Sequence, residues 1–221
     1  MLQTSTLSFL KKLKKNNNKS WFDANRPVYE KAKADFMQFI QAVIDRHAKK
    51  DPSIQNLVAK DCLFRINRDV RFSKDKSPYK NNMGAYFNGA GKKAITGGYY
   101  FHCQPGRCFA GGGIWMPMPA ELIKVRQEID YNFAEFKKII GSKKFKSVYG
   151  GLSTDKEYVL TRVPKGYEAD NPAAEYLKMK SFVATVSLKD TDITSKDLLK
   201  KVLTAFETLY PLLKFVNRSI E

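Results

Sequence analysis

The densest group of charged side chains in this sequence lies in the run from Phe64 to Lys80. Three of the chain's nine arginines fall within seven residues of this run. Guanidinium groups bind phosphates and carboxylates through paired N–H donors, and lysines add further positive charge. These residue types predict a site for an anionic ligand, either a phosphate-bearing molecule or nucleic acid. The candidate ligand-binding residues are Arg65, Arg68, Asp69, Arg71, Lys74, Asp75, Lys76, Tyr79 and Lys80.

The balance of charge in this run leaves two interpretations open. The window from Leu63 to Met83 holds six basic and two acidic residues, so four positive charges remain after both acids are paired. That surplus favours an anionic ligand. The alternative is an ion-pair network that fixes a long loop to a sheet, since such networks also cluster charges. We expect at least two of the three arginines to pair with Asp69, Asp75 or an anion, with Lys76 or Lys80 at the rim of the same cleft.

The start of the run has the alternation of a β-strand. One predicted face is apolar and is interrupted by Arg68, which therefore needs an acidic partner. The segment from Ser73 to Pro78 has the composition of a turn, so a basic loop is expected beside the sheet. The apolar face would consist of Phe64, Ile66, Val70 and Phe72.

The run from Arg68 to Lys80, RDVRFSKDKSPYK, resembles the signature of a family of conserved hypothetical proteins of bacteria and fungi with a domain of unknown function. Trp21-Phe22, the segment from Pro105 to Pro117 and Pro164 to Tyr167 are also similar to that family, so the resemblance covers nearly the whole chain. It implies family membership without an assigned activity. Relatives often have a histidine where this chain has Asn171, and a threonine followed by histidine or asparagine at Asn81-Asn82.

Composition bounds the class of protein. A chain of 221 residues with 43% hydrophobic and 28% charged residues is typical of a globular protein. The net charge is +17, of which residues 1–120 carry +13, and no acidic residue lies between Asp75 and Glu121. Such a surface attracts polyanions, although a solvated lysine surface is the simpler alternative. Three cysteines are too few, and odd in number, for a set of disulfides, which predicts a cytoplasmic protein. No apolar run is long enough to span a bilayer, so no membrane contact is expected.

The periodicity of apolar residues predicts a single α+β domain over residues 1–221. Its antiparallel sheet is expected between residues 62 and 115, flanked by N-terminal and C-terminal helices. Strands are also expected at 158–163 and 182–188. Helices are predicted at 4–15, 26–48, 119–130, 132–140 and 172–180, with a last one that follows a capping box at 194–197 and runs to Pro211 or beyond.

The sequence from Gln104 to Arg107 predicts a tight turn that pairs Cys103 with Cys108 in a hairpin. The glycines at 111–113 either lie under aromatic rings or let a ligand approach the backbone. We expect no metal site, because His102 and Cys103 point to opposite faces of a strand. His47, near the end of a long helix, is expected to be solvated.

No sequence motif of a known cofactor or nucleotide site is present, and no cofactor is expected. A cytosolic binding module for an anionic ligand is the first hypothesis. The second is an enzyme of unrecognised type, with Asp69 or Asp75 as base and Tyr79 or a lysine as acid. The third is a structural or interaction protein in which the run is architectural.

Overall fold

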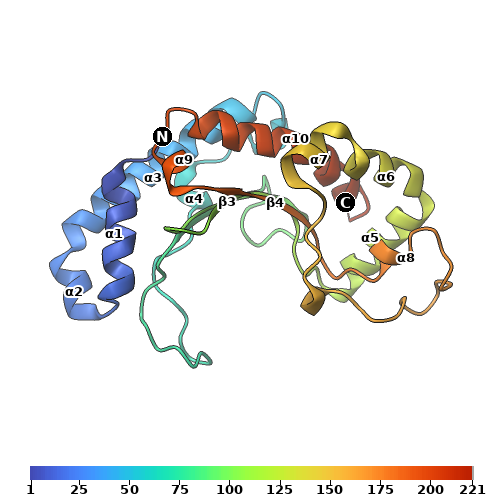
Figure 1. Cartoon of the computed structure of the whole chain (residues 1–221), viewed down its shortest axis with the longest axis horizontal. Coiled ribbons are helices and arrows are strands. Elements are labelled where there is room, and N and C mark those ends of the chain that lie inside the picture. The colour runs from blue at the N-terminus through green and yellow to red at the C-terminus, as the bar shows by residue number, and fades with distance from the viewer. Residues whose placement is uncertain (221) are drawn as a thin grey trace. The chain divides into compact units, whose positions relative to one another are not determined.

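The computed structural model describes residues 1–220 (Figure 1). The strands are β1 (Met83–Phe87), β2 (Gly98–Cys103), β3 (Cys108–Ile114) and β4 (Phe182–Leu188). The helices are α1 (Thr4–Lys15), α2 (Lys19–Ala24), α3 (Arg26–His47), α4 (Ala59–Cys62), α5 (Pro119–Tyr131), α6 (Phe133–Gly141), α7 (Lys143–Tyr149), α8 (Ala174–Leu177), α9 (Asp190–Ile193) and α10 (Leu198–Arg218), with short 3-10 turns η1 (Pro52–Ile54) and η2 (Lys156–Tyr158).

The four strands form one antiparallel sheet in the order β1-β2-β3-β4, which confirms the α+β class. The predicted hairpin is also confirmed. Gly106 has φ +77°, the value that the third position of a type II turn requires, and the Arg107 amide donates to the Gln104 carbonyl over 2.8 Å. Cys103 ends β2 and Cys108 begins β3, and the Cys108 thiol donates to the Gln104 carbonyl over 3.1 Å.

The chain divides into two compact units, each made of separate segments. Unit 1 comprises residues 1–92, 100–110 and 187–203, and unit 2 comprises residues 93–99, 111–186 and 204–221. The boundaries fall within β2, β3, β4 and α10. The single domain over residues 1–221 stays a prediction.

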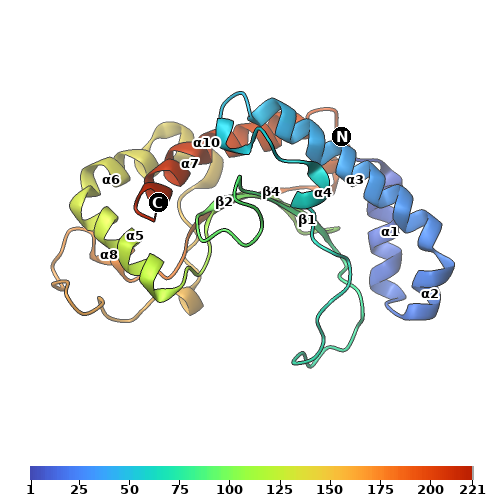
Figure 2. The same ribbon diagram turned by 180° about the vertical axis from the view of Figure 1, so that it is seen from behind.

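In unit 1, α3 covers one face of the sheet (Figure 2). Its apolar residues recur at helical spacing, and Phe36 and Phe39 pack against Phe101 of β2 with ring centroids 5.9 and 5.2 Å apart. The helix α1 buries an apolar stripe and is tied to α3 by the Thr6 hydroxyl, which donates to Asp35 over 2.5 Å. The core of unit 1 thus includes the layer between α3 and the sheet, while α1 packs on α3.

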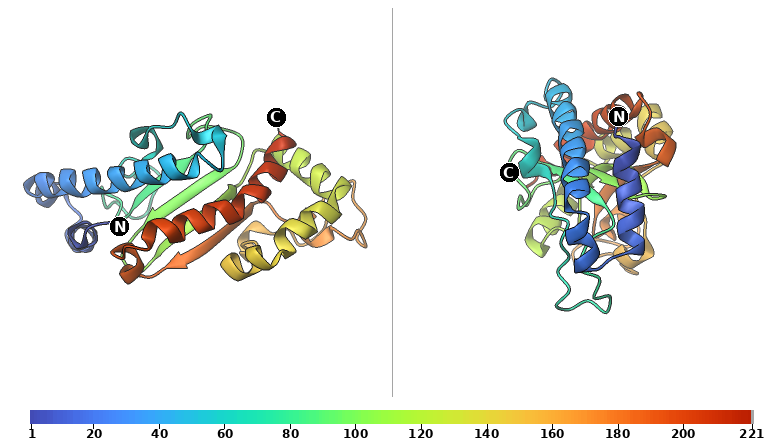
Figure 3. Two further views of the ribbon diagram at one scale, coloured as in Figure 1. Left: turned by 90° about the horizontal axis from the view of Figure 1, so that it is seen from above. Right: turned by 90° about the vertical axis from the view of Figure 1, so that its left-hand side faces the viewer.

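In unit 2, α5 and α6 lie beside the C-terminal part of α10 (Figure 3, left). Phe136 of α6 contacts Phe215 of α10 with ring centroids 5.4 Å apart, and Tyr149 donates to the Ala205 carbonyl over 2.6 Å. The helix α10 continues past Pro211 to Arg218, although proline cannot donate the helical hydrogen bond. Burial of apolar side chains on both sides of the proline explains this continuation, among them Leu209, Leu212, Leu213 and Val216.

Several predicted elements differ from the structure. The capping box at 194–197 is wrong, since the Asp197 amide donates instead to the Ser195 hydroxyl over 3.1 Å. The strand at 158–163 is reduced to a single bridge between Val159 and Met179. His47 is only 1% exposed, because the last turn of α3 carries it into the core of unit 1.

Candidate functional site

The segment between α4 and β1 is a long loop rather than the predicted strand (Figure 2). Its two ends pair only through isolated bridges, Leu63 with Ala85 and Asn67 with Tyr79. Between them the chain turns back on itself, and the Arg68 amide donates to the Pro78 carbonyl over 2.9 Å. The predicted apolar face therefore does not form. Phe72, one of its four members, is 96% exposed.

Both aspartates of this loop pair with arginines, as the sequence predicted. Arg71 binds Asp69 through two parallel contacts, Nε–Oδ1 at 3.0 Å and Nη2–Oδ2 at 2.7 Å. Arg68 forms a salt bridge with Asp75, whose other oxygen accepts from the Ser77 hydroxyl over 2.6 Å. Hydrogen bonds from Arg71 lower the pKa of Asp69, and those from Ser77 and Arg68 lower the pKa of Asp75.

The lysines of the loop differ in their contacts. The Lys76 ammonium donates to the Val70 carbonyl and the Lys80 ammonium to the Arg65 carbonyl, each over 3.0 Å. Burial, with the nearby charge of Arg65, lowers the pKa of Lys80. Lys74 is exposed, and among residues 1–220 no carboxylate lies within salt-bridge distance of it.

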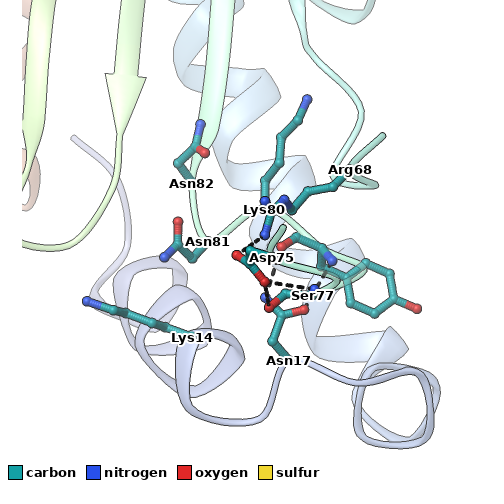
Figure 4. Close-up of a pocket in the computed structure, with 9 residues that line it drawn as sticks. Lys14, Asn17, Arg68, Asp75, Ser77, Lys80, Asn81 and Asn82 are labelled. Atoms are coloured by element: carbon teal, nitrogen blue, oxygen red, sulfur yellow. Dashed lines mark hydrogen bonds and ion pairs between the residues drawn. The ribbon is translucent and has the colours of Figure 1, made fainter. Parts of the chain in front are cut away.

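Four of the predicted residues line one polar pocket of about 430 Å³ (Figure 4). The expectation of two arginines paired with aspartates is confirmed, but only one of these pairs, Arg68–Asp75, lies at the pocket that Lys80 lines. The other five predicted residues do not line it, namely Arg65, Asp69, Arg71, Lys74 and Lys76. The full lining is Lys14, Asn17, Arg68, Asp75, Ser77, Tyr79, Lys80, Asn81 and Asn82.

Tyr79 separates the polar pocket from a second one and is held from two sides. The Asn17 side chain makes two hydrogen bonds to its backbone, donating to the Tyr79 carbonyl over 2.9 Å and accepting from the amide over 3.0 Å. Its ring stacks on Phe22 of α2 with centroids 4.0 Å apart. Because Tyr79 lines both pockets, these contacts fix the wall between them.

The second pocket, called the basic pocket below, has a volume of about 610 Å³. Among its lining residues there is no aspartate or glutamate. Aromatic rings of Phe22, Tyr29, Phe64 and Tyr79 form much of its wall. Its five cationic side chains are Arg26, Lys33, Lys60, Arg65 and Lys92.

Only Arg65 and Tyr79 of this pocket were in the predicted set. Arg26 and Lys33 were missed, although their spacing of seven residues on the predicted helix places them on one face. Lys60 was missed because no pattern in its surroundings links it to the arginine-rich run. Lys92 was missed as well, although it lies in the stretch between Asp75 and Glu121 that has no acidic residue.

The cations of the basic pocket are not equally free. Arg26 pairs with Asp23 at 2.8 Å, Lys33 lies 3.8 Å from Glu30, and the Lys92 ammonium donates to the Leu63 carbonyl over 2.7 Å. For Lys60 and Arg65, no carboxylate among residues 1–220 lies within salt-bridge distance. These two side chains are therefore available to a ligand.

The hairpin of β2 and β3 meets the basic pocket at Phe64, whose ring centroid lies 6.2 Å from that of Tyr100. Tyr100 is also hydrogen-bonded to His102 over 3.0 Å, and His102 stacks on Phe109 at 4.7 Å. Burial raises the pKa of Tyr100 to about 12. The Tyr100 hydroxyl thus stays protonated at neutral pH.

The glycines at 111–113 have a structural explanation. A Cβ atom at Gly111 would lie 2.0 Å from the Ala184 carbonyl oxygen, and one at Gly113 would lie 2.1 Å from that of Phe182. Both carbonyls belong to β4, the neighbouring strand. The two strands approach closely at this point. Packing of β3 against β4 therefore explains the glycines, and no ligand is needed to account for them.

The comparisons with known proteins bear on the family. A family model described as "Conserved hypothetical protein (DUF2461)" matches residues 5–215. The chain belongs to the DUF2461 family. Comparison with curated proteins and with solved structures gave no match. The resemblance to a family of conserved hypothetical proteins is confirmed, and since the DUF2461 description names no activity, function has to be argued from the site.

Two further findings concern the part of this DUF2461 chain that the structure describes. Within residues 1–220, no group of three or more histidine, cysteine, aspartate or glutamate side chains is placed to hold a metal ion. None of the helices over the same residues combines the length and apolarity that crossing a bilayer requires.

Arg68→Ala is expected to loosen the loop without unfolding the protein. The Arg68 side chain is 25% exposed and that of Asp75 is 60% exposed, so water screens their pairing. The urea midpoint should stay close to that of the parent, while amide hydrogen exchange over residues 66–80 becomes faster. Arg71→Ala is the control, since the Arg71 side chain is 76% exposed. A large loss of global stability in Arg68→Ala would mean that this arginine is a buried structural cation instead.

Proposed function

We propose that this protein is a binding module for a phosphate-bearing anion, and that the basic pocket of unit 1 is the binding site. The observation that carries the proposal is the lining of that pocket, five cations and no carboxylate around aromatic walls. Its volume of about 610 Å³ lies within the range of small-molecule sites.

The charge of unit 1 supports this proposal. Unit 1 contains 24 basic and 11 acidic residues, a net charge of +13, whereas unit 2 contains 15 and 11, a net charge of +4. The excess of positive charge therefore belongs to the unit that holds the basic pocket. Such a field raises the local concentration of anions and accelerates their association, with a strong dependence on salt.

The unpaired cations favour phosphate as the recognised group. Arg65 offers a planar fork of N–H donors and Lys60 a compact charge, a combination suited to phosphate oxygens. Aromatic rings beside these cations would contact the uncharged part of the ligand. The polar pocket is a weaker candidate, because Arg68 is already paired with Asp75 there.

The alternative of an enzyme with Asp69 or Asp75 as general base receives less support. Both carboxylates are bound by arginine, and the pKa of each is lowered. A carboxylate with a lowered pKa and occupied oxygens is a poor proton acceptor near neutral pH. The contacts of these aspartates fit a role in bracing the loop.

Replacement of the two unpaired cations tests the proposal. In the double variant Lys60→Ser/Arg65→Ser, each lost charge is expected to cost about 1.5 kcal/mol of binding, so the Kd for tripolyphosphate should rise about a hundredfold. Isothermal titration at low salt measures this, and the parent's affinity should fall steeply as salt is added.

The matched control is Lys124→Ser/Arg162→Ser, which removes one lysine and one arginine from exposed positions of unit 2. Its affinity for tripolyphosphate should remain near that of the parent. Equal weakening in both double variants would mean that binding follows overall charge rather than the basic pocket. Absence of tripolyphosphate binding by the parent would refute the proposed function.

A further inference from the structure

We propose that the loop from Arg68 to Lys80 binds single-stranded nucleic acid, with an unpaired base stacked on Phe72. This inference rests on the proposed function, because it names the class of anion that would bind the basic pocket and the adjoining loop. Its starting point is the exposure of Phe72, whose side chain is 96% exposed. A fully solvated phenylalanine presents its ring face to water, where a flat partner can stack on it.

The loop holds Phe72 outward in a defined geometry. The Asp69–Arg71 pair flanks the ring on one side, and the Lys76 ammonium donates to the Val70 carbonyl over 3.0 Å. At the base of the loop, the Arg68 amide donates to the Pro78 carbonyl over 2.9 Å. Much of the cost of ordering the loop is thus met before any ligand binds.

The charge around Phe72 fits a polyanion. Residues 68–80 include five basic and two acidic residues, and both acids are paired with arginines of the same loop. The Arg71 guanidinium lies 5.9 Å from the centre of the Phe72 ring. Phosphates on either side of a stacked base would meet Lys74, which pairs with no carboxylate among residues 1–220, and Lys76.

A second aromatic residue with the same surroundings lies at the start of the run. Phe64 is 44% exposed, and the ammonium groups of Lys80 and Lys92 lie 5.7 and 5.8 Å from its ring centre. Phe64 also lines the basic pocket. Proteins that bind single-stranded nucleic acid without sequence preference use exposed aromatic rings with cations beside them, since every base has a face that can stack.

The observations favour single-stranded nucleic acid over an anionic membrane surface. One phenylalanine supplies little insertion energy, and stable attachment to lipid needs a second apolar anchor. Val70, the other apolar residue near the tip, is partly buried. The cations instead continue from the loop to Lys80, Arg65 and the basic pocket, where a phosphate backbone could follow them.

Two substitutions at Phe72 separate stacking from simple apolar contact. Phe72→Ala removes the side chain, and Phe72→Leu keeps an apolar side chain but removes the ring face. Both variants should weaken binding of a labelled short oligothymidylate roughly tenfold in fluorescence anisotropy, the size of one base–aromatic stack. Tyr131→Ala is the matched control, since this tyrosine of unit 2 is 79% exposed. Its affinity should equal that of the parent.

Tripolyphosphate titrations separate failure of this inference from failure of the proposed function. Phe72 variants should bind tripolyphosphate as the parent does. If the parent binds tripolyphosphate but not the oligonucleotide, or if Phe72→Ala binds the oligonucleotide unchanged, this inference is overturned and the proposed function stands. If Phe72→Leu binds the oligonucleotide like the parent, the claim that a base stacks on the Phe72 ring is overturned. Phe72-dependent binding to phosphatidylserine vesicles without oligonucleotide binding would identify a membrane surface and overturn it too.

Discussion

Gly113→Ala is expected to lower the free energy of unfolding by about 4 kcal/mol, combining the cost of overpacking with that of a disfavoured backbone conformation. Gly113 has φ +127°, and a Cβ atom there would lie 2.1 Å from the Phe182 carbonyl oxygen and 2.7 Å from the Val183 Cα. These contacts are with backbone, so no side-chain rotation relieves them. Urea denaturation followed by circular dichroism measures the loss.

Two other glycines separate the causes of this effect. Gly106 has φ +77° with open space where a Cβ would lie, so Gly106→Ala should show only the conformational cost of about 1 kcal/mol. Gly151 has open space and no positive φ, and Gly151→Ala should be close to neutral. If Gly113→Ala were no more harmful than Gly106→Ala, the close approach of β3 to β4 would not be a constraint on the sequence.

Acidification from pH 6.5 to pH 4 is expected to remove about 3 kcal/mol of stability through His47. Burial lowers the pKa of this imidazole to about 4, partly offset by the charge of Asp51, against 6.5 in the unfolded chain. Between these values the unfolded state binds the proton and the folded state does not. Stability from this residue is therefore complete above about pH 6.5 and falls as the pH approaches 4.

Urea denaturation at a series of pH values checks this expectation. His47→Gln should flatten the dependence of stability on pH between 6.5 and 4. His102→Gln is the necessary comparison, because burial also lowers the pKa of His102. If His47→Gln is not stable enough for denaturation measurements, titration of the His47 imidazole by NMR in the parent gives the pKa directly. A pKa near 6.5 would contradict the expectation.

Much of the fold follows from local sequence. The helix at Thr4–Lys15 was predicted with its bounds, and α3 nearly so, because an apolar stripe at helical spacing is decided within a few turns. The hairpin was predicted because Pro105 and Gly106 specify the turn between its strands. In each case the determining residues are neighbours in the chain.

The errors arise where distant contacts decide. Residues 64–72 alternate as a strand does, but their hydrogen bonds go to isolated bridges, and Phe72 has no facing element to bury it. His47 lies among charged residues in the sequence, yet the packing of α3 buries it. The basic pocket was largely missed for the same reason, since Arg26, Lys60 and Arg65 are joined only by tertiary structure.

The segmented make-up of unit 1 has a consequence for synthesis on the ribosome. The Leu2 amide donates to the Ile193 carbonyl over 2.9 Å, and Lys11 pairs with Asp190 at 3.1 Å. The first helix leaves the exit tunnel long before residues 190–193 are translated. Contacts between such distant residues also slow folding. During synthesis α1 can therefore pack on α3 early, through contacts such as Phe9 with Tyr29, whereas its links to residues 190–193 form only when nearly the whole polypeptide has emerged.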